Sequence, residues 1–347
     1  MKEPVTSPRS SAPEISVVVP VRNEEASIRI LLETLLTQTL RPKEVVITDG
    51  GSVDATRDII EEFIKAGAPV RLIREENSLP GRSRNLGAKN SHSEWIAFTD
   101  AGTRSGPDWL ASLAENLGDG SAVDVVYGSY EPVVDSFFKE CAAIAYVPPV
   151  ASTAEGPARP RSIVSALMRR KAWEAVGGFP EHLRSAEDLL FMNKIEQAGF
   201  RTVRAPRAVV YWTIQPGLGS TFRRFYVYAR NNIRAGLWRQ WQAAIFRRYA
   251  VIMLVALPAI FLGVRWLIVP LFFWLTLLVA RATRALRQNR QSYPAGIFRN
   301  SLRLLLIAPI IATLDAAAFA GTISWFFSDK LRLAPMRHVR PNDDSGE

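Results

Sequence analysis

The sequence predicts an α/β domain with a mostly parallel sheet covered by helices on both faces, followed by a region of apolar helices long enough to cross a membrane. From residue 15 to residue 128, short apolar runs alternate with stretches whose apolar residues recur at helical spacing, which is the pattern of β-α units. Residues 249–280 and 304–327 are nearly free of charged side chains, as membrane-crossing segments are. Ligands of such sheets bind beyond the carboxyl ends of the strands, so polar residues that follow strands are the first candidates for a site.

Each strand of the predicted sheet is a short, mainly apolar run. The first, ISVVVP, is followed by Asn23 as a helix cap and by an amphipathic stretch with its leucines on one side. The second, KEVVIT, is followed by VDATRDIIEEFIKAG, a helix that Gly67 is expected to stop. The expected strands are residues 15–20, 43–48, 70–73, 94–99 and 123–128, and the expected helices are residues 24–38, 53–67, 81–89 and 108–116.

The alternation breaks between Glu131 and Ile163. This segment includes VPPVASTAEGPARP, which is too long and too rich in proline for a simple connection. Long loops in compact domains are often binding loops or lids. We therefore expect residues 147–160 to form a binding loop, and we expect regular structure again over SALMRRKAWEAVGGFP and EDLLFMNKIEQAGF.

The apolar region predicts a membrane anchor. Residues 249–280 carry one charged side chain, Arg265. As a single helix they would extend about 48 Å, beyond a hydrocarbon core of about 30 Å, so the segment is expected to fold back near Gly263 to Arg265. In the last apolar segment, Asp315 is expected to face other helices or water, because a carboxylate is costly in lipid. The expected spans are residues 249–264, 266–280 and 304–327.

The flanking charges predict the orientation of these spans. Residues 281–303 hold six arginines and no acidic residue, so the positive-inside rule places this loop in the cytoplasm. Three spans would put the partly basic tail on the opposite side. Either one segment is re-entrant or the tail crosses despite its charge. The expected divisions are a disordered N-terminus of residues 1–14 without a signal peptide, a domain of residues 15–243, a membrane region of residues 244–328 with two or three spans, and a polar tail of residues 329–347.

Composition narrows the possible functions. The chain has 347 residues, 48% of them hydrophobic, enough for a sizeable core and a second region. Its net charge of +10 suits a phosphorylated substrate, an anionic membrane surface or nucleic acid, but the arginines gather beside the apolar spans, which argues against nucleic acid. The single cysteine, Cys141, excludes an intramolecular disulfide and is expected to fill the core, and the three histidines provide no zinc-site spacing.

Four motifs follow one another in the first domain: VVVPVRNEE, ITDGGSVDAT, GRSRNLGAKNSHSEWIAFTDAG and VGGFPEHLRSAEDLLFMNKIEQAGF. Their order, spacing and context over residues 15–212 resemble the family 2 glycosyltransferases of the GT-A fold, in the membrane-anchored bacterial type. The resemblance implies a Rossmann-like fold that binds a nucleotide-diphosphate sugar. A dinucleotide-dependent enzyme is disfavoured, because no G-x-G-x-x-G follows the first strand.

The resemblance implies a donor site at the carboxyl ends of the strands. It places the base of the nucleotide at Asp49, with Asn23 or Glu24 nearby. The alternative is that Asp49 only caps the next helix through the DGGS turn. The residues that we assign to the donor are Pro20, Asn23, Glu24, Asp49, Gly51, Arg84, Asn85, Asp100, Ala101 and Gly102.

The metal requirement stays open. The DXD motif of the family corresponds here to Asp100-Ala101-Gly102, so the last acid, which usually binds the metal, is missing, and Trp212 stands where the family often has a metal-binding histidine. A Mg²⁺ or Mn²⁺ ion held by Asp100, phosphate oxygens and waters is one way to neutralise the diphosphate. Arginine is the other, with Arg82, Arg84 and Arg230 as candidates, although Arg230 fits a membrane-surface anchor equally well.

The resemblance assigns the general base to Asp188, with Glu187 as the second candidate. An acceptor hydroxyl that attacks the anomeric carbon must lose its proton, and a positioned carboxylate can take it, which predicts a single displacement with inversion. The alternative is that both acids only cap the helix that begins there.

The resulting hypothesis is an inverting glycosyltransferase in the inner (cytoplasmic) membrane, multi-pass, with its catalytic domain in the cytoplasm. Its partners would be a nucleotide-sugar donor, a lipid-linked or cell-envelope glycan acceptor and membrane lipids. The alternative is a membrane-bound sugar-nucleotide-binding protein that has lost catalysis, which the departures at Gly102 and Trp212 would fit.

Overall fold

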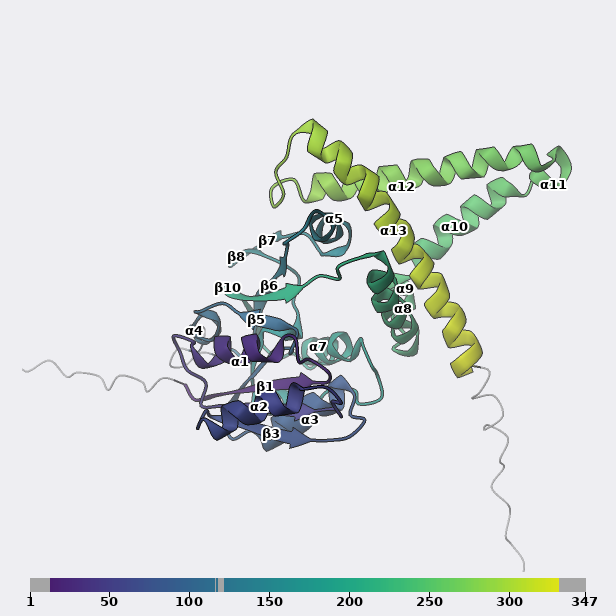
Figure 1. The fold of residues 1–347 in the computed structure, drawn as a ribbon. Coiled ribbons are helices and arrows are strands. Elements are labelled where there is room, and N and C mark those ends of the chain that lie inside the picture. The colour runs from purple at the N-terminus through teal and green to yellow at the C-terminus, as the bar shows by residue number, and fades with distance from the viewer. Residues whose placement is uncertain (1–12, 116, 118–121, 331–347) are drawn as a thin grey trace, which may run out of the picture. The chain divides into compact units, whose positions relative to one another are not determined.

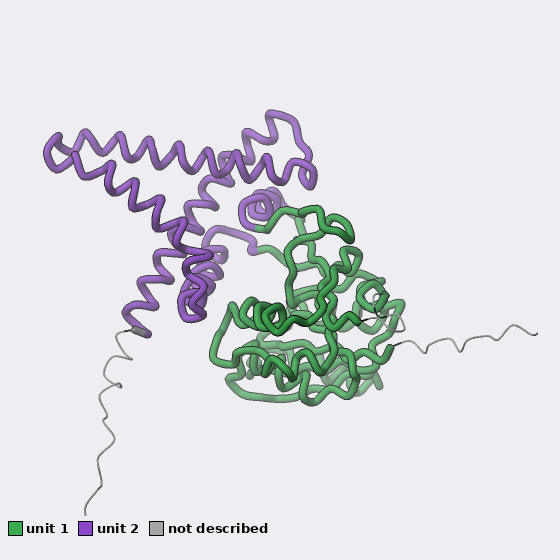
Figure 2. The backbone as a smooth tube through the Cα atoms, turned by 180° about the vertical axis from the view of Figure 1, so that it is seen from behind, with its two compact units in different colours: residues 1–135, 147–214 green, residues 136–146, 215–347 purple. Residues whose placement is uncertain are grey.

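The structure, a computed structural model, describes residues 13–115, 117 and 122–330. The predicted N-terminal segment up to residue 12 and the polar tail from residue 331 lie outside the described residues. The chain forms two compact units (Figure 2), of which unit 1 comprises residues 1–135 and 147–214 and unit 2 comprises residues 136–146 and 215–347. Unit 2 therefore includes a segment from within the first domain's sequence, whereas the expectation was a continuous domain up to residue 243.

Unit 1 is built on a mixed sheet of eight strands, drawn in Figure 1, in the order β3-β2-β1-β4-β9-β6-β10-β5. The pairs β1-β2, β1-β4, β2-β3 and β6-β10 are parallel, and β9 runs antiparallel to β4 and β6, as β5 does to β10. The predicted α/β class is confirmed, with antiparallel pairings that the local pattern did not indicate. The strands are β1 (Ile15–Val21), β2 (Glu44–Asp49), β3 (Val70–Arg74), β4 (Trp95–Phe98), β5 (Thr103–Ser105), β6 (Val125–Val133), β9 (Ala166–Arg169) and β10 (Thr202–Thr213).

Two apolar cores cover the two faces of this sheet, because successive side chains of a strand point to opposite faces. Val17 and Val19 of β1 join the core that includes α1, α2 and α4, whereas Val18 joins the core that includes α3, α6 and α7. The helices are α1 (Ile28–Leu36), α2 (Thr56–Lys65), α3 (Pro80–Asn90), α4 (Trp109–Ala114), α6 (Arg170–Ala175) and α7 (Glu187–Gln197), and a short 3-10 turn, η1 (Ile163–Ser165), precedes β9. Helices thus lie on both faces, as predicted.

Two local predictions were wrong and one was confirmed. Asn23 does not cap a helix, since α1 begins only at Ile28 and Asn23 has a left-handed backbone with φ 55°. The segment between Glu131 and Ile163 is not a plain loop, because it contains helix α5 (Phe137–Tyr146) and the hairpin strands β7 (Ala151–Thr153) and β8 (Gly156–Ala158). Gly67 follows the end of α2 with φ 78°, as its expected role as a stop signal requires.

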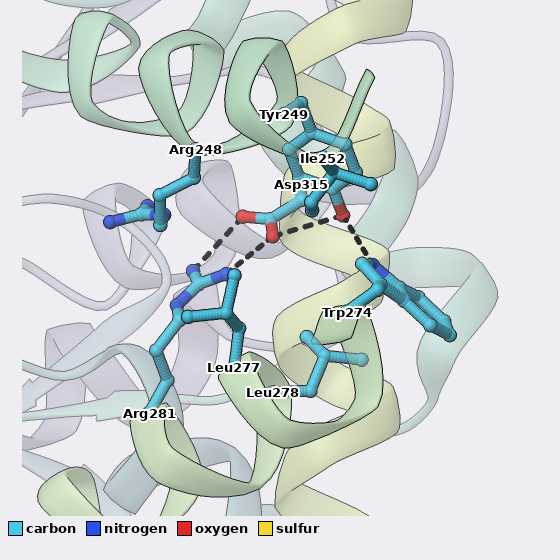
Figure 3. A pocket seen from close by; sticks show the side chains of 8 residues that line it. All are labelled: Arg248, Tyr249, Ile252, Trp274, Leu277, Leu278, Arg281 and Asp315. Carbon is cyan, nitrogen blue, oxygen red and sulfur yellow. Dashed lines mark hydrogen bonds and ion pairs between the residues drawn. The ribbon is translucent and has the colours of Figure 1, made fainter. Parts of the chain in front are cut away.

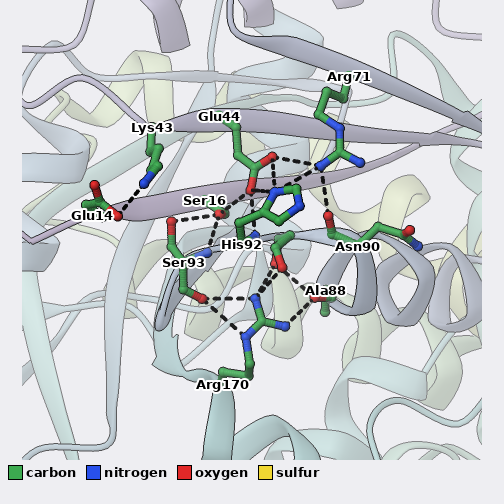
Figure 4. Close-up of polar contacts among 11 residues, drawn as sticks. Glu14, Ser16, Lys43, Glu44, Arg71, Ala88, Asn90, His92, Ser93 and Arg170 are labelled. Carbon is green, nitrogen blue, oxygen red and sulfur yellow. Dashed lines mark hydrogen bonds and ion pairs between the residues drawn. The ribbon is translucent and has the colours of Figure 1, made fainter.

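A polar network closes the amino-terminal edge of the sheet (Figure 4). The buried carboxylate of Glu44 accepts hydrogen bonds from the Ser16 hydroxyl at 2.8 Å, from the His92 backbone N–H at 2.7 Å and from Arg71 at 3.0 Å. Burial by itself raises the pKa of Glu44, but these donors outweigh it, and the pKa lies below its usual value. Arg170 donates to the backbone carbonyls that end α3, including Ala88 at 2.7 Å. Because this network occupies the amino edge, the opposite, carboxyl edge is the place to look for a site.

Unit 2 consists of helices. Helix α5 packs against α12 and α13, and Glu140 on α5 pairs with Arg303 and Arg299 of α13. Cys141 is buried on α5, as expected. The chain reverses after α11 at Gly263, where φ is 82°. The elements are α8 (Leu218–Arg234), α9 (Trp238–Trp241), α10 (Ala243–Ala256), α11 (Ala259–Leu262), η2 (Val264–Leu267), α12 (Ile268–Gln288), α13 (Ile297–Trp325) and η3 (Phe326–Lys330).

Three segments of unit 2 are long and apolar enough to cross a membrane, Ala243–Leu262, Val264–Gln288 and Ile297–Asp329. Asp315 in the last of them is fully buried and paired with Arg281, so the expectation that it faces other helices is confirmed.

Candidate active site

The predicted acids lie at one edge of the sheet. Val21, which ends β1, pairs with Asp49, which ends β2, and Asp100 follows β4, the strand on the other side of β1. Neighbouring strands are about 4.8 Å apart, so β2, which ends at Asp49, and β4, which precedes Asp100, are separated by about 10 Å. The polar residues that end or follow the parallel strands β1, β2 and β4 thus lie at the same carboxyl edge, where α/β sheets bind ligands.

The loops after β1 and β2 are tied together by hydrogen bonds. The backbone N–H of Asn23 donates to the Ser52 hydroxyl at 2.9 Å, and the side-chain oxygen of Asn23 accepts from the Val53 N–H at 2.9 Å. The backbone N–H of Glu24 donates to Thr56 Oγ1 at 2.7 Å. The left-handed backbone of Asn23 is what brings its amide into this position. The two loops therefore form one hydrogen-bonded unit beside the expected position of the donor's nucleotide.

Asp49 is fully buried within these two loops. Its Oδ1 accepts from the Ser52 N–H at 3.0 Å and from the Ser52 hydroxyl at 2.5 Å, and its Oδ2 pairs with Nε of Arg57. Arg57 also donates to Glu76 at 2.7 Å. Asp49 thus makes the contacts expected of a turn cap, which was the alternative interpretation. Its contact with the base of the nucleotide stays a prediction. The sequence analysis did not single out Arg57, although it stands on the first turn of α2, five residues after the DGGS turn.

Arg84 on α3 joins the acids of two different segments. Its side chain is 4% exposed, and it donates to Oδ1 of Asp100 at 2.6 Å and to Oε1 of Glu187 at 2.6 Å. Its guanidinium also lies 5.5 Å from the centre of the Phe179 ring. Burial lowers the pKa of Arg84, but Asp100, Glu187 and Asp188 outweigh it and the pKa is raised. The guanidinium is therefore a permanent positive centre among three carboxyls.

The acid pair stands at the start of α7, after Ala186 with a left-handed backbone at φ 71°. Glu187 is buried, and in the described part of the chain its second oxygen, Oε2, has no hydrogen-bond partner. Asp188 is half-buried, and its Oδ1 accepts from the Leu189 N–H at 2.8 Å. Burial is the main reason why the pKa of each of these carboxyls is raised above its usual value. A carboxylate with a raised pKa is a stronger proton acceptor near neutral pH.

Asn85 on α3 holds the turn that contains Gly178 and Phe179. It donates to the Phe179 carbonyl at 2.9 Å and accepts from the Phe179 N–H at 2.8 Å and from Trp173 Nε1 at 3.1 Å. Gly178 has φ 68°, and a Cβ there would lie 2.5 Å from the Asn85 oxygen, so only glycine lets this turn reach Asn85. Phe179 is buried and stacks on Phe191 at 3.9 Å, which makes it a core residue.

The DXD-like segment lies beside Glu24. A Cβ on Gly102 would be 3.9 Å from Oε2 of Glu24, and Trp212 pairs with Thr103 in the next strand, β5. Ala101 is buried, and Pro20 lies in β1. Gly51 has φ 92°, with the Glu76 carboxylate 2.6 Å from the position of an added Cβ. The residues assigned to the donor, apart from Asn85, therefore line or support the carboxyl edge.

The arginines expected at the diphosphate all have acidic partners. Arg82 is 46% exposed and pairs with Glu75 and Glu181, and Arg230 lies in unit 2 and pairs with Asp329. Among the described residues, no group of three or more His, Cys, Asp or Glu side chains could hold a metal ion. One arginine among Asp100, Glu187 and Asp188 leaves an excess of negative charge when all three are ionised, so a diphosphate requires a further cation or protons there.

Comparisons with known proteins point to glycosyltransferases. Residues 16–175 match the family described as Glycosyl transferase family 2. Glycosyltransferase AglE of Haloferax volcanii is 30% identical over 198 residues, which are 55% of this chain and 64% of that protein. Glycosyltransferase GlyA of Streptococcus pneumoniae is 31% identical over 117 residues, which are 34% of this chain and 17% of that protein. The chain thus spans less than two thirds of the length of either relative.

The fold is shared with a solved structure, that of mannosyltransferase PcManGT from Pyrobaculum calidifontis in complex with GDP-Man and Mn²⁺. The TM-score is 0.53 at 19% sequence identity, with 94% of this chain and 92% of that chain covered. A likeness at this identity concerns the fold alone, and it confirms the expected GT-A class.

Proposed function

We propose that this chain, whose residues 16–175 match Glycosyl transferase family 2, transfers a sugar with inversion from a nucleotide-diphosphate donor to a lipid-linked or cell-envelope glycan acceptor. The observation that carries the proposal is the acid centre at the carboxyl edge of the sheet. There Arg84 holds Asp100 and Glu187, and the half-buried Asp188 stands beside them at the start of α7.

The geometry favours Asp188 over Glu187 as the base. Glu187 is buried, with Oε1 held by Arg84 and Oε2 enclosed away from solvent, so an acceptor hydroxyl would have to displace Arg84 or the groups that cover Oε2. Asp188 is half-buried, and in the described residues the Leu189 N–H is the hydrogen-bond donor on its Oδ1. In the proposed step the acceptor oxygen bonds to the anomeric carbon, the bond from that carbon to the diphosphate oxygen breaks, and the acceptor proton passes to Asp188.

The donor's diphosphate is proposed to lie beside Asp100. This carboxylate is 36% exposed, and Arg84 occupies only Oδ1, so Oδ2 is left for a Mg²⁺ or Mn²⁺ ion that keeps waters and phosphate oxygens as its other ligands. Such an ion, when bound, neutralises the charge that develops on the leaving diphosphate. The excess of negative charge around Arg84 supports this assignment, and Mn²⁺ accompanies GDP-Man in the structural neighbour.

Unit 2 is proposed to hold the enzyme at the cytoplasmic face of the membrane. The charged helix α8 lies along the C-terminal half of α13, because Tyr226 donates to Ser324 at 2.6 Å and a Cβ on Gly321 would meet the Tyr226 carbonyl at 2.6 Å. Arg230 and Arg234 of α8 also pair with Asp329. A helix with such charges stays out of lipid. We infer that this half of α13 lies at the membrane surface and that the hairpin from α10 to α12 is the inserted part.

The test is donor turnover by the purified full chain in detergent. A panel of nucleotide sugars is assayed for binding by calorimetry and for slow hydrolysis, with and without EDTA. We expect one donor to bind and to be hydrolysed, and EDTA to weaken its binding until Mn²⁺ or Mg²⁺ is restored. Binding without hydrolysis or transfer would instead support the alternative, a sugar-nucleotide-binding protein. Asp100→Ala is expected to weaken donor binding, and an unchanged affinity would contradict the diphosphate assignment.

A further inference from the structure

The apolar helices of unit 2 enclose a polar cluster that the proposed sugar transfer does not use (Figure 3). Asp315 on α13 accepts two hydrogen bonds from Arg281 on α12, at 2.5 and 3.0 Å. The Tyr249 hydroxyl on α10 donates to Asp315 at 3.3 Å and accepts from Trp274 Nε1 at 3.1 Å. Side chains from α10 and α12 thus meet at a single buried carboxylate on α13. Ionisable residues within apolar helices mark functional sites more often than not.

Arg248 makes this cluster unbalanced in charge. It lines the same cavity as Arg281 and Asp315 and interacts electrostatically with both. Within the described ranges, its Nε is buried without a hydrogen-bond partner, and no ion pair of its side chain is found. Arg281 already neutralises Asp315, so the charge of Arg248 has no counterpart in the cluster. The cavity of about 10 Å³ has room for about one water, so a larger anion would have to meet the half-buried Arg248 outside this cavity.

The depth of Arg248 suits a lipid headgroup. It stands five residues, or about 7.5 Å, into α10, and Arg281 stands seven residues, or about 10 Å, before the end of α12. These are the two helix ends on the same side of the hairpin, because the chain reverses at Gly263. A headgroup layer is about 5–8 Å thick on each side of the hydrocarbon core. With these helix ends at the outer edge of that layer, both arginines would lie near the boundary between headgroups and hydrocarbon.

We propose that Arg248 binds the phosphate ester of a membrane lipid, with the Arg281–Asp315 pair holding the helices around it. A phosphate matches the forked donors of arginine, and it supplies the missing negative charge at the depth where lipid phosphates lie. The phosphate belongs either to a polyprenyl phosphate that carries the acceptor or to a bulk phospholipid. The proposal rests on insertion of the hairpin from α10 to α12, not on sugar transfer by unit 1.

The test measures lipid binding to the full chain in uncharged detergent by native mass spectrometry. The probes are a polyprenyl monophosphate, the uncharged polyprenol of the same length, and phosphatidylglycerol. For the wild type we expect a phosphate lipid to bind about tenfold or more tightly than the polyprenol, the effect of one charge-assisted hydrogen-bonded contact. Arg248→Gln should abolish this preference and leave donor hydrolysis unchanged. The control is Arg247→Gln, since Arg247 is exposed on the same helix turn and should keep the preference.

Two results would overturn the proposal. Equal binding of polyprenol and phosphate lipids by the wild type would overturn it whatever the variants show. An equal loss of the preference in Arg247→Gln and Arg248→Gln would also overturn it, because it would indicate an effect of general surface charge. Arg248→Lys, which keeps the charge without the fork, is expected to retain part of the preference. Tighter binding of polyprenyl phosphate would identify the acceptor carrier, and tighter binding of phosphatidylglycerol would identify a structural lipid.

Discussion

Arg84 is the residue on which the acid centre depends, and replacing it with methionine tests that dependence. Methionine keeps most of the apolar stem and removes the charge. Glu187, whose side chain is 5% exposed, then stays buried without a counter-charge, and loss of one partner of a buried pair typically costs about 3–5 kcal/mol. The pair with Asp100 adds little, because Asp100 is 36% exposed and exposed pairs contribute about 0–1 kcal/mol.

Protonation of Glu187 limits the cost. In the variant its pKa rises further, because Arg84 is the charge that lowers it in the wild type. Taking up a proton costs about 1.4 kcal/mol for each pH unit above the ordinary pKa of 4.5. The loss of stability from leaving Glu187 without Arg84 is therefore at most about 3.4 kcal/mol at pH 7 and about 0.7 kcal/mol at pH 5. The pKa of Glu187 is raised in the wild-type fold and higher still in the variant, so the stability of the variant relative to the wild type must fall as the pH rises through this window.

The assay is the melting temperature of the full chain in detergent at pH 5 and pH 7. At about 2–4 °C per kcal/mol, Arg84→Met should melt about 7–14 °C below the wild type at pH 7 and only about 1–3 °C below it at pH 5. The matched control is Arg82→Met on the same helix, whose surface pairs should contribute about 1 kcal/mol or less. Adding Glu187→Gln to Arg84→Met should restore most of the loss at pH 7. A loss that is the same at both pH values, or no larger than that of Arg82→Met, would refute the reasoning.

Three further predictions concern other parts of the chain. Asp188→Asn should lower sugar transfer by at least about 100-fold, the usual share of a general base, with donor affinity kept. The control is Asp124→Asn, because Asp124 directly precedes β6 at the amino edge of the sheet. Full transfer by Asp188→Asn would remove Asp188 from the base role. Gly81→Ala should destabilise unit 1 by about 1–3 kcal/mol, because its Cβ would lie 2.1 Å from the Pro180 carbonyl oxygen; Gly219→Ala, with open space around it, serves as the control in the same melting assay. Glu140→Gln should lower the melting temperature at pH 7 but much less at pH 4. Burial raises the pKa of Glu140, but the hydrogen bonds from Arg299 and Arg303 outweigh burial and bring the pKa below its usual value, so the stability that this lowered pKa provides is lost as the pH falls. An equal loss at both pH values would contradict this prediction.

The local elements of this protein could be predicted from its sequence because their patterns are local. The alternating apolar residues of β1 and the stripe of α1 depend on neighbours within one strand or a few helical turns. The position of Asp100 directly after a buried strand was sufficient to place it at the carboxyl edge, since parallel strands end together. The apolar segments around Gly263 likewise indicated helices of membrane length and their reversal.

Only the tertiary structure decided which charges meet. Arg84 joins Asp100, 16 residues away, and Glu187, 103 residues away, and the sequence offered several arginines with equal claims to those acids. Asn85 holds the turn at Phe179, a contact that no local pattern indicated, and its assignment to the donor stays a prediction. Helix α5 leaves the first domain's sequence to pack in unit 2. An ion pair or a tight turn depends on which elements fold side by side, and on competition between many similar charges, which no local pattern records.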